Sequence, residues 1–199
     1  ITKVKGLDPN GEMAINAESA GFNKFAFSTF DDAFDKKTLD PGRARFEKMI
    51  AGVYLGRLGL EIFKAAAKEG FFSPAAAAAI GSLQALESID LDNFCCGWVN
   101  SPNALDTVFA ADSDKAVARR LATPVFERAA ILTAIHLAAF IIKTGGGTDP
   151  ASPVCVNIDG STYYKTRTVS FPKIVKAELD AMLAPRHVSF ALTCVDDAP

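Results

Sequence analysis

Residues 13–22 read Met-Ala-Ile-Asn-Ala-Glu-Ser-Ala-Gly-Phe, and residues 39–56 read Leu-Asp-Pro-Gly-Arg-Ala-Arg-Phe-Glu-Lys-Met-Ile-Ala-Gly-Val-Tyr-Leu-Gly. The first stretch predicts a short buried strand that delivers Glu18 into a glycine-containing turn. The second predicts a helix with Asp40 as its N-cap, Pro41 at its first position and Glu47 near its start. Ionised carboxylates accept strong hydrogen bonds, so Glu18 and Glu47 on different elements are suited to converge on a polyhydroxy ligand.

The chain around these two stretches alternates short strands with longer helices. Residues 1–16 predict a hairpin around an Asp-Pro-Asn-Gly turn. The helix that begins at Pro41 is expected to run to about Lys68 and to end at Gly70. Gly52, Gly56 and Gly59 lower its helix propensity, which usually means close approach of another element or of a ligand, and close packing is the favoured interpretation.

The helical middle of the chain is followed by a mixed segment. Proline after a capping residue opens one helix at Ser73-Pro74 and a separate one at Thr123-Pro124. Residues 154–158 predict a buried strand, 159–161 a turn, 162–165 a return strand, 171–183 a helix and 188–195 a third strand. This order predicts one α/β domain over residues 1–199, with a mixed sheet covered by helices and a helical insertion at residues 71–122.

Composition excludes several classes of partner. The 199-residue chain is 49% hydrophobic with a net charge of -2, which provides no electrostatic footprint for nucleic acid or an anionic membrane. The apolar run 129–142 is shorter than the roughly 20 residues that span a bilayer. No charged region followed by an apolar run marks a signal peptide near Ile1. We therefore expect a cytoplasmic protein without a membrane partner.

Cysteine and histidine usage argues against a metal centre. The four cysteines form no Cys-x-x-Cys pair and there are only two histidines, so no zinc site is predicted. Reduced thiols are favoured over redox activity for adjacent Cys95 and Cys96. The glycine run 145–147 follows a helix and lacks the Lys-Ser/Thr of a phosphate-binding loop, so it is interpreted as a connector.

Five motifs in fixed order give the chain a family resemblance. Residues 15–22 resemble the segment that supplies one sugar-binding glutamate in the hexokinase family, and residues 46–56 resemble that family's most distinctive helix, which supplies another. Arg128-Ala129-Ala130 resembles a helix on the nucleotide side. Residues 159–165 resemble an Asp-Gly-Ser/Thr-x-Tyr-Lys hairpin, and 188–190 resemble the strand before the adenosine loop. Each motif alone is weak, but the ordered set is specific.

The resemblance implies a ribonuclease-H-like fold of the actin/hexokinase ATPase type and ATP-dependent phosphorylation of a hexose at its primary hydroxyl, with Mg²⁺. It assigns sugar contacts to Glu18, Glu47 and Asn16. It implies that the catalytic Asp and both phosphate loops precede Ile1, so no residue of this chain is assigned as catalytic. The chain then corresponds to the C-terminal part of the large lobe of a bacterial-type member and is inactive alone. Its unpaired strand edges are expected to lead either to self-association or to tight binding of the missing N-terminal half.

The resemblance also assigns positions on the nucleotide side to Gly52, Arg128 and Glu127. Glu127, or Phe126 if the alignment shifts by one, stands where the family has a Ser or Thr that touches nucleotide. Residues 17–20 lack the family's Trp. These departures keep a second hypothesis open, a non-catalytic sugar-binding or regulatory fragment. From the residues alone, Asn16 is favoured as a brace of its turn, and Lys48 is expected to be a surface charge rather than a phosphate ligand.

Overall fold

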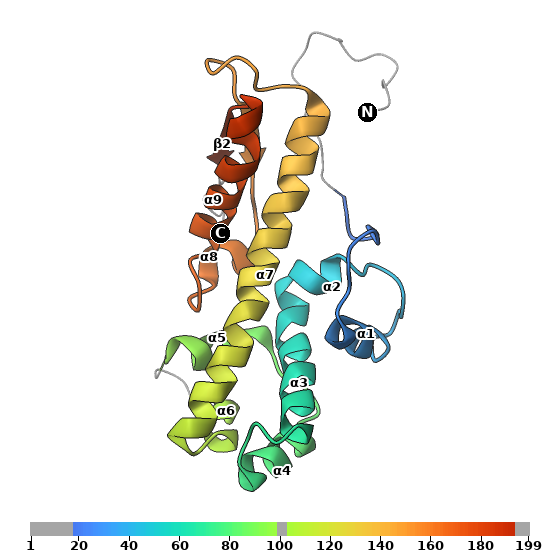
Figure 1. Ribbon diagram of the computed structural model, residues 1–199, viewed down its shortest axis with the longest axis vertical. Coiled ribbons are helices and arrows are strands. Elements are labelled where there is room, and N and C mark those ends of the chain that lie inside the picture. The colour runs from blue at the N-terminus through green and yellow to red at the C-terminus, as the bar shows by residue number, and fades with distance from the viewer. Residues whose placement is uncertain (1–17, 99–102, 194–199) are drawn as a thin grey trace.

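The computed structural model of the chain describes residues 18–98 and 103–193, and their elements are drawn in Figure 1. The predicted N-terminal hairpin and Asn16 lie outside these residues. The elements in chain order are α1 (Thr29–Asp35), α2 (Glu47–Ile50), α3 (Gly52–Lys68), α4 (Pro74–Ser82), α5 (Ser88–Cys96), α6 (Ala104–Val108), α7 (Asp112–Thr144), β1 (Val154–Asn157), α8 (Ser161–Lys165), α9 (Phe171–Leu183), the 3-10 turn η1 (Ala184–Arg186) and β2 (Phe190–Thr193).

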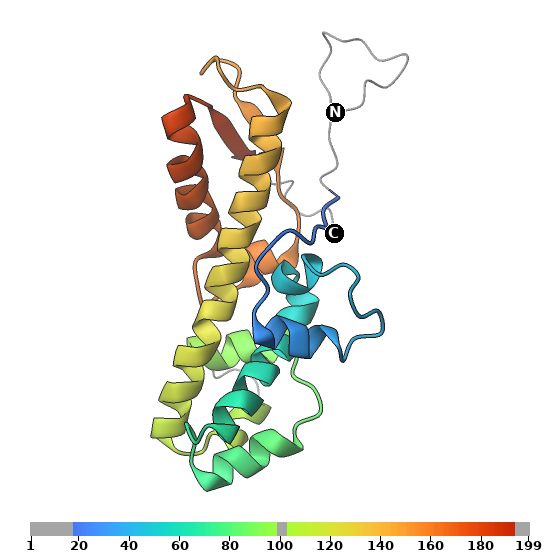
Figure 2. The ribbon, with the colours of Figure 1, turned by 45° about the vertical axis from the view of Figure 1, so that its right-hand side comes forward.

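Helix α7 is the central element of the fold. It runs along the long axis of the molecule, with α3 to α6 gathered around its N-terminal half and α9 beside its C-terminal half (Figures 1 and 2). Its buried side chains join those of α3 and α9 in the main hydrophobic core. By length and composition α7 could cross a membrane, and 44% of its most apolar window is buried inside the fold.

The predicted break at Thr123-Pro124 is wrong, because α7 continues through Pro124. The Thr123 hydroxyl donates to the carbonyl of Arg119 at 2.9 Å instead of capping a new helix. An internal proline costs a helix about 3 kcal/mol. Ala122, Val125 and Phe126 beside it are buried to 0, 4 and 2% exposure, and packing of these side chains offsets that cost.

The helix predicted from Pro41 begins later than expected. Residues 41–46 are turns, with φ of +82° at Gly42 and +47° at Ala44, and the helical backbone is interrupted again at Ala51. The Gly42 N–H donates to Asp35 Oδ2 at 2.7 Å, so a tertiary contact overrides the local cap signal. The predicted end is confirmed, since Gly70 has φ of +78° and the Phe71 N–H donates to the Ala66 carbonyl at 3.0 Å.

Close packing explains the glycines of α3, as the sequence predicted. A Cβ at Gly56 would lie 2.4 Å from the carbonyl carbon of Glu87, and one at Gly59 would lie 2.6 Å from Leu91 Cδ2. The Gly56 N–H also donates to Ser88 Oγ at 2.6 Å. Helix α5 therefore rests directly on the backbone of α3.

Gly56→Ala is expected to destabilise the protein by about 1–3 kcal/mol, because a backbone segment of the chain occupies the space that the methyl group needs. Gly81 lies in α4 with nothing within 4 Å of its Cβ position. The same change at Gly81 is expected to stabilise by about 0.5–1 kcal/mol, since alanine is the better helix former. Thermal midpoints of the two variants should move in opposite directions, and a shared direction would contradict the packing argument.

The sheet of the described residues has two parallel strands. β1 pairs with β2 from Val154–Phe190 to Asn157–Thr193. The predicted return strand at residues 162–165 is wrong, because those residues form α8. Tyr163 in α8 is buried and its ring lies 6.0 Å from that of Phe171, so side-chain packing decides against the local strand propensity. The helix at 171–183 is confirmed, and the last residues of the predicted third strand lie outside the described part.

Residues 71–122 contain α4, α5, α6 and the first part of α7. Their buried side chains belong to the same core cluster as those of α1, α3 and α9. A smaller cluster of Phe46, Met49 and Leu132 joins α2 to α7. One core thus connects the helical segment to the rest, and the status of 71–122 as an insertion stays a prediction.

Candidate functional site

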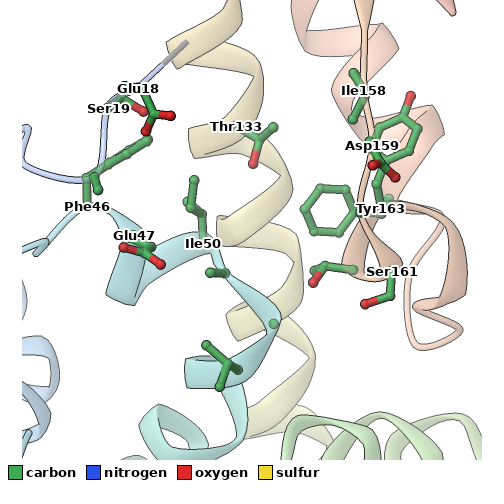
Figure 3. A pocket seen from close by; sticks show the side chains of 17 residues that line it. Glu18, Ser19, Phe46, Glu47, Ile50, Thr133, Ile158, Asp159, Ser161 and Tyr163 are labelled. Atoms are coloured by element: carbon green, nitrogen blue, oxygen red, sulfur yellow. The ribbon is translucent and has the colours of Figure 1, made fainter. Parts of the chain in front are cut away.

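A cavity of ≈ 560 Å³ lies between α2, α7 and the loop that leads from β1 into α8 (Figure 3). Its walls combine carboxylates, hydroxyl groups and glycine backbone with a comparable share of apolar side chains, among them Phe46, Ile50 and Phe171. The lining residues used below are Glu18, Glu47, Gly52, Thr133, Asp159, Ser161 and Thr162. This mixture suits a small polar ligand that offers hydroxyl groups.

One wall carries the two predicted sugar-binding carboxylates. Glu18 and Glu47 come from segments far apart in sequence, and Figure 3 shows both on the same side of the cavity. The Glu47 side chain is half-buried, and no hydrogen bond or ion pair joins it to another described residue. A half-buried carboxylate without a protein partner is suited to accept hydrogen bonds from a ligand.

The opposite wall is formed by the loop after β1. Asp159 and Ser161 lie across the cavity from the two glutamates, and Thr133 of α7 lies between the two walls (Figure 3). Gly160 has φ of +141°, which turns the chain sharply between strand and helix. The sequence predicted this loop only as the turn of a hairpin, so Asp159 and Ser161 were missed as site residues. Thr133 was missed, and a polar residue inside the apolar run 129–142 was the only signal for it.

Asp92 of α5 anchors the segment that follows this wall. Its carboxylate is 3% exposed and accepts the backbone N–H groups of Arg167 at 3.0 Å and Thr168 at 2.8 Å. The Thr168 hydroxyl donates back to the Asp92 carbonyl at 3.1 Å. The chain leaving α8 is therefore tied to the helical segment 71–122.

Gly52 lies where the main cavity meets a smaller one of ≈ 270 Å³, which is also lined by Ser88, Thr162 and Lys165. A Cβ at Gly52 would lie 2.3 Å from Thr162 Oγ1. Helix α3 therefore approaches α8 closely at this point, and a larger residue at position 52 would require the Thr162 side chain to shift. Gly52, predicted on the nucleotide side, thus lies at the site with Glu18 and Glu47.

Arg128 and Glu127 line neither of these two cavities. The Arg128 guanidinium donates to both oxygens of Asp31, at 2.7 and 2.9 Å, and so holds α1 against α7. The Glu127 side chain is exposed. The structure does not bring these two residues to the site, and their nucleotide role stays an untested prediction.

Arg128→Met is expected to destabilise the protein by about 1–3 kcal/mol at pH 7, because it leaves a buried carboxylate unpaired. Burial raises the pKa of Asp31, but hydrogen bonds from Arg128 and Ser28 outweigh it and lower that pKa. A lowered pKa stabilises the folded state above the ordinary pKa and loses that effect as pH falls. The difference in unfolding free energy between wild type and variant should therefore shrink below about pH 4. A difference that does not change with pH would contradict the ion pair.

The expectation that Lys48 is a surface charge is wrong. Its side chain is 3% exposed and donates to Asp35 Oδ1 at 2.8 Å. A lysine is almost never buried to this degree unless it is paired. The partner carboxylate therefore accounts for its burial.

Comparison with solved structures identifies the fold. The chain superimposes on a hexokinase crystal structure with a TM-score of 0.70 and 24% identity, over 90% of this chain and 40% of that one. A hexokinase from Schistosoma mansoni complexed with glucose gives a TM-score of 0.65 at 21% identity, over 84% of this chain and 38% of that one. The fold is accordingly of the actin/hexokinase-like α/β type, as expected.

Comparisons of sequence identify the family to which the chain belongs. The family model for hexokinase matches residues 1–199, so the chain belongs to the hexokinase family. It is 30% identical over 193 residues to human Hexokinase-2, covering 90% of this chain and 21% of that protein. It is 41% identical over 61 residues to Hexokinase-7 of Oryza sativa subsp. japonica, covering 29% of this chain and 13% of that protein. The chain thus spans about a fifth of the length of the mammalian relative.

Proposed function

We propose that this chain is the sugar-binding portion of an ATP-dependent hexose kinase, which phosphorylates a glucose-like hexose at its primary hydroxyl. The observation that carries the proposal is the meeting of Glu18 and Glu47 in one cavity. Both were predicted from the sequence as sugar ligands, and Glu47 has no partner among the described residues. The glucose bound by the hexokinase of Schistosoma mansoni, which shares this fold, supports the choice of ligand.

The predicted sugar ligands have defined roles in this proposal. Glu18 and Glu47 accept hydrogen bonds from ring hydroxyls and so orient the sugar, with Asn16 as a third contact. Orientation matters because a misplacement of about 1 Å can lower the rate roughly 100-fold. The ring fixed in this way presents one hydroxyl to the wall formed by Asp159 and Ser161.

Bound ATP with Mg²⁺ supplies the phosphoryl group in this reaction. The small cavity beyond Gly52 carries Lys165 but also the carboxylates of Glu87 and Asp92. These carboxylates would repel a polyphosphate, so we assign no phosphate contact to it. In this proposal the residues of this chain bind and orient the sugar. We assign no general base among them.

Two measurements on the full-length protein test this function. Calorimetric titration with glucose, mannose, fructose and the pentitol xylitol should show saturable binding of at least one hexose and none of xylitol. A coupled assay should then show ATP consumption that depends on that hexose. Hexose binding without ATP consumption would support the non-catalytic alternative, and absence of hexose binding would overturn the proposal.

A further inference from the structure

A buried cation lies beside the proposed sugar-binding carboxylate. Lys48 follows Glu47 in α2, and its ammonium donates to Asp35 Oδ1 at 2.8 Å, Thr38 Oγ1 at 2.8 Å and the Asp40 carbonyl at 2.9 Å. An ammonium group has three hydrogens to donate, so all of them are used. None remains for a phosphate, and Lys48 acts inside the protein.

The partners of Lys48 hold both ends of one loop. Asp35 ends α1, and its second oxygen accepts the Gly42 N–H at 2.7 Å. Thr38 and Asp40 lie within the loop between α1 and α2. Together with Lys48, these contacts close residues 36–46 into a fixed turn that leads into Phe46 and Glu47.

Helix α2 cannot hold Glu47 in place by itself. It has four residues, and no side chain caps its N-terminus. Helices this short are unstable in water unless tertiary contacts support them. Those contacts are Phe46 and Met49 packed with Leu132 of α7, and Lys48 bound to Asp35.

We propose that Lys48, held by Asp35, is a positioning residue that sets the direction of the Glu47 carboxylate at the sugar. The inference rests on the proposed function. The Asp40 carboxylate also lies close to Lys48, with its Oδ1 3.1 Å from the ammonium. Burial alone lowers the pKa of Lys48, but hydrogen bonds with the Asp35 and Asp40 carboxylates outweigh it and raise that pKa, while the pKa of Asp35 is lowered. The ion pair is therefore charged throughout the neutral range, as a fixed support requires.

The test compares hexose and ATP constants of full-length variants. Lys48→Met should raise KM for the hexose about 10- to 100-fold, because orientation of the ring is lost, and leave KM for ATP within about twofold. Thr38→Val removes one of the three hydrogen bonds of Lys48, together with the bond from the Thr38 hydroxyl to the Asp35 carbonyl at 2.7 Å. It should raise KM for the hexose about 3-fold, and it provides the test if Lys48→Met does not fold. Lys37→Met is the control, since Lys37 pairs with Glu61 on the surface and should change neither constant by more than about twofold.

A double-mutant cycle separates positioning from a general structural role. In the Glu47→Gln background, Lys48→Met or Thr38→Val should change hexose affinity by less than about twofold further, because its effect passes through Glu47. Equal effects in both backgrounds, a parallel rise in KM for ATP, or no effect of Thr38→Val would overturn the inference. If Glu47→Gln itself leaves hexose affinity unchanged, the proposed sugar site fails instead, so the two failures are distinguishable.

Discussion

Glu47→Gln is expected to weaken hexose binding by the full-length protein about 10- to 100-fold. Hydrogen bonds to a charged group contribute about 1.5–3 kcal/mol, and 1.4 kcal/mol corresponds to a tenfold change in affinity. Glutamine keeps the shape of the side chain but replaces one acceptor oxygen with a donor and removes the charge. The Glu47 side chain makes no hydrogen bond or ion pair within the described residues, so the thermal midpoint should stay within about 2 °C of wild type.

Glu69→Gln is the matched control for this experiment. Glu69 is an exposed glutamate at the end of α3 and lines neither cavity of the site. Replacement of Glu69 by glutamine should leave hexose affinity within about twofold of the wild-type value. An affinity in Glu47→Gln equal to that of Glu69→Gln would remove Glu47 from the site.

The sequence predicted the wall that carries Glu18 and Glu47 better than the opposite one. Glu18 and Glu47 were named from short motifs because the chemistry of each resides in a single side chain. The opposite wall was expected as a hairpin. Its residues 162–165 have side chains typical of strands, and tertiary contacts such as the packing of Tyr163 against Phe171 favour the helix instead. This contact joins two consecutive helices, so it leaves no signal within residues 162–165 themselves.

Helix ends were likewise predicted correctly where local residues determine them and incorrectly where tertiary contacts do. Gly70 and the start of α4 at Pro74 were predicted correctly, because a left-handed glycine and an N-terminal proline act within one turn. The helix starts predicted at Pro41 and Pro124 were wrong. At the first, Asp35 binds the Gly42 N–H, and at the second, burial of α7 compensates for the proline. Propensity decides the outcome only where no tertiary contact opposes it.

The role of Lys48 could not be predicted from its neighbours in sequence. A lysine beside a glutamate in a first helical turn is usually exposed. Its burial depends on Asp35, which lies 13 residues earlier and on another helix. A contact at that separation becomes visible only when α1 and α2 are placed against each other.

Phe63→Ala is expected to lower the free energy of unfolding by about 3–5 kcal/mol, because it removes a fully buried ring and leaves a cavity. Phe63 lies at 0% exposure in α3, with its ring 5.2 Å from that of Phe109 and 6.1 Å from that of Phe72. For a domain of this size the thermal midpoint should fall by roughly 6–20 °C.

Phe71→Ala is the matched control for that loss, since Phe71 lies just beyond the same helix with 63% of its surface exposed. It should change stability by no more than about 0.5 kcal/mol. Equal shifts of the midpoint in the two variants would contradict the aromatic core. Neither residue lines the candidate site, so hexose affinity of folded Phe63→Ala should stay within about threefold of wild type, because distant sites behave nearly independently. A large loss of hexose affinity in Phe63→Ala would instead show that loss of packing in the core beneath α3 changes the positions of Gly52 and Glu47.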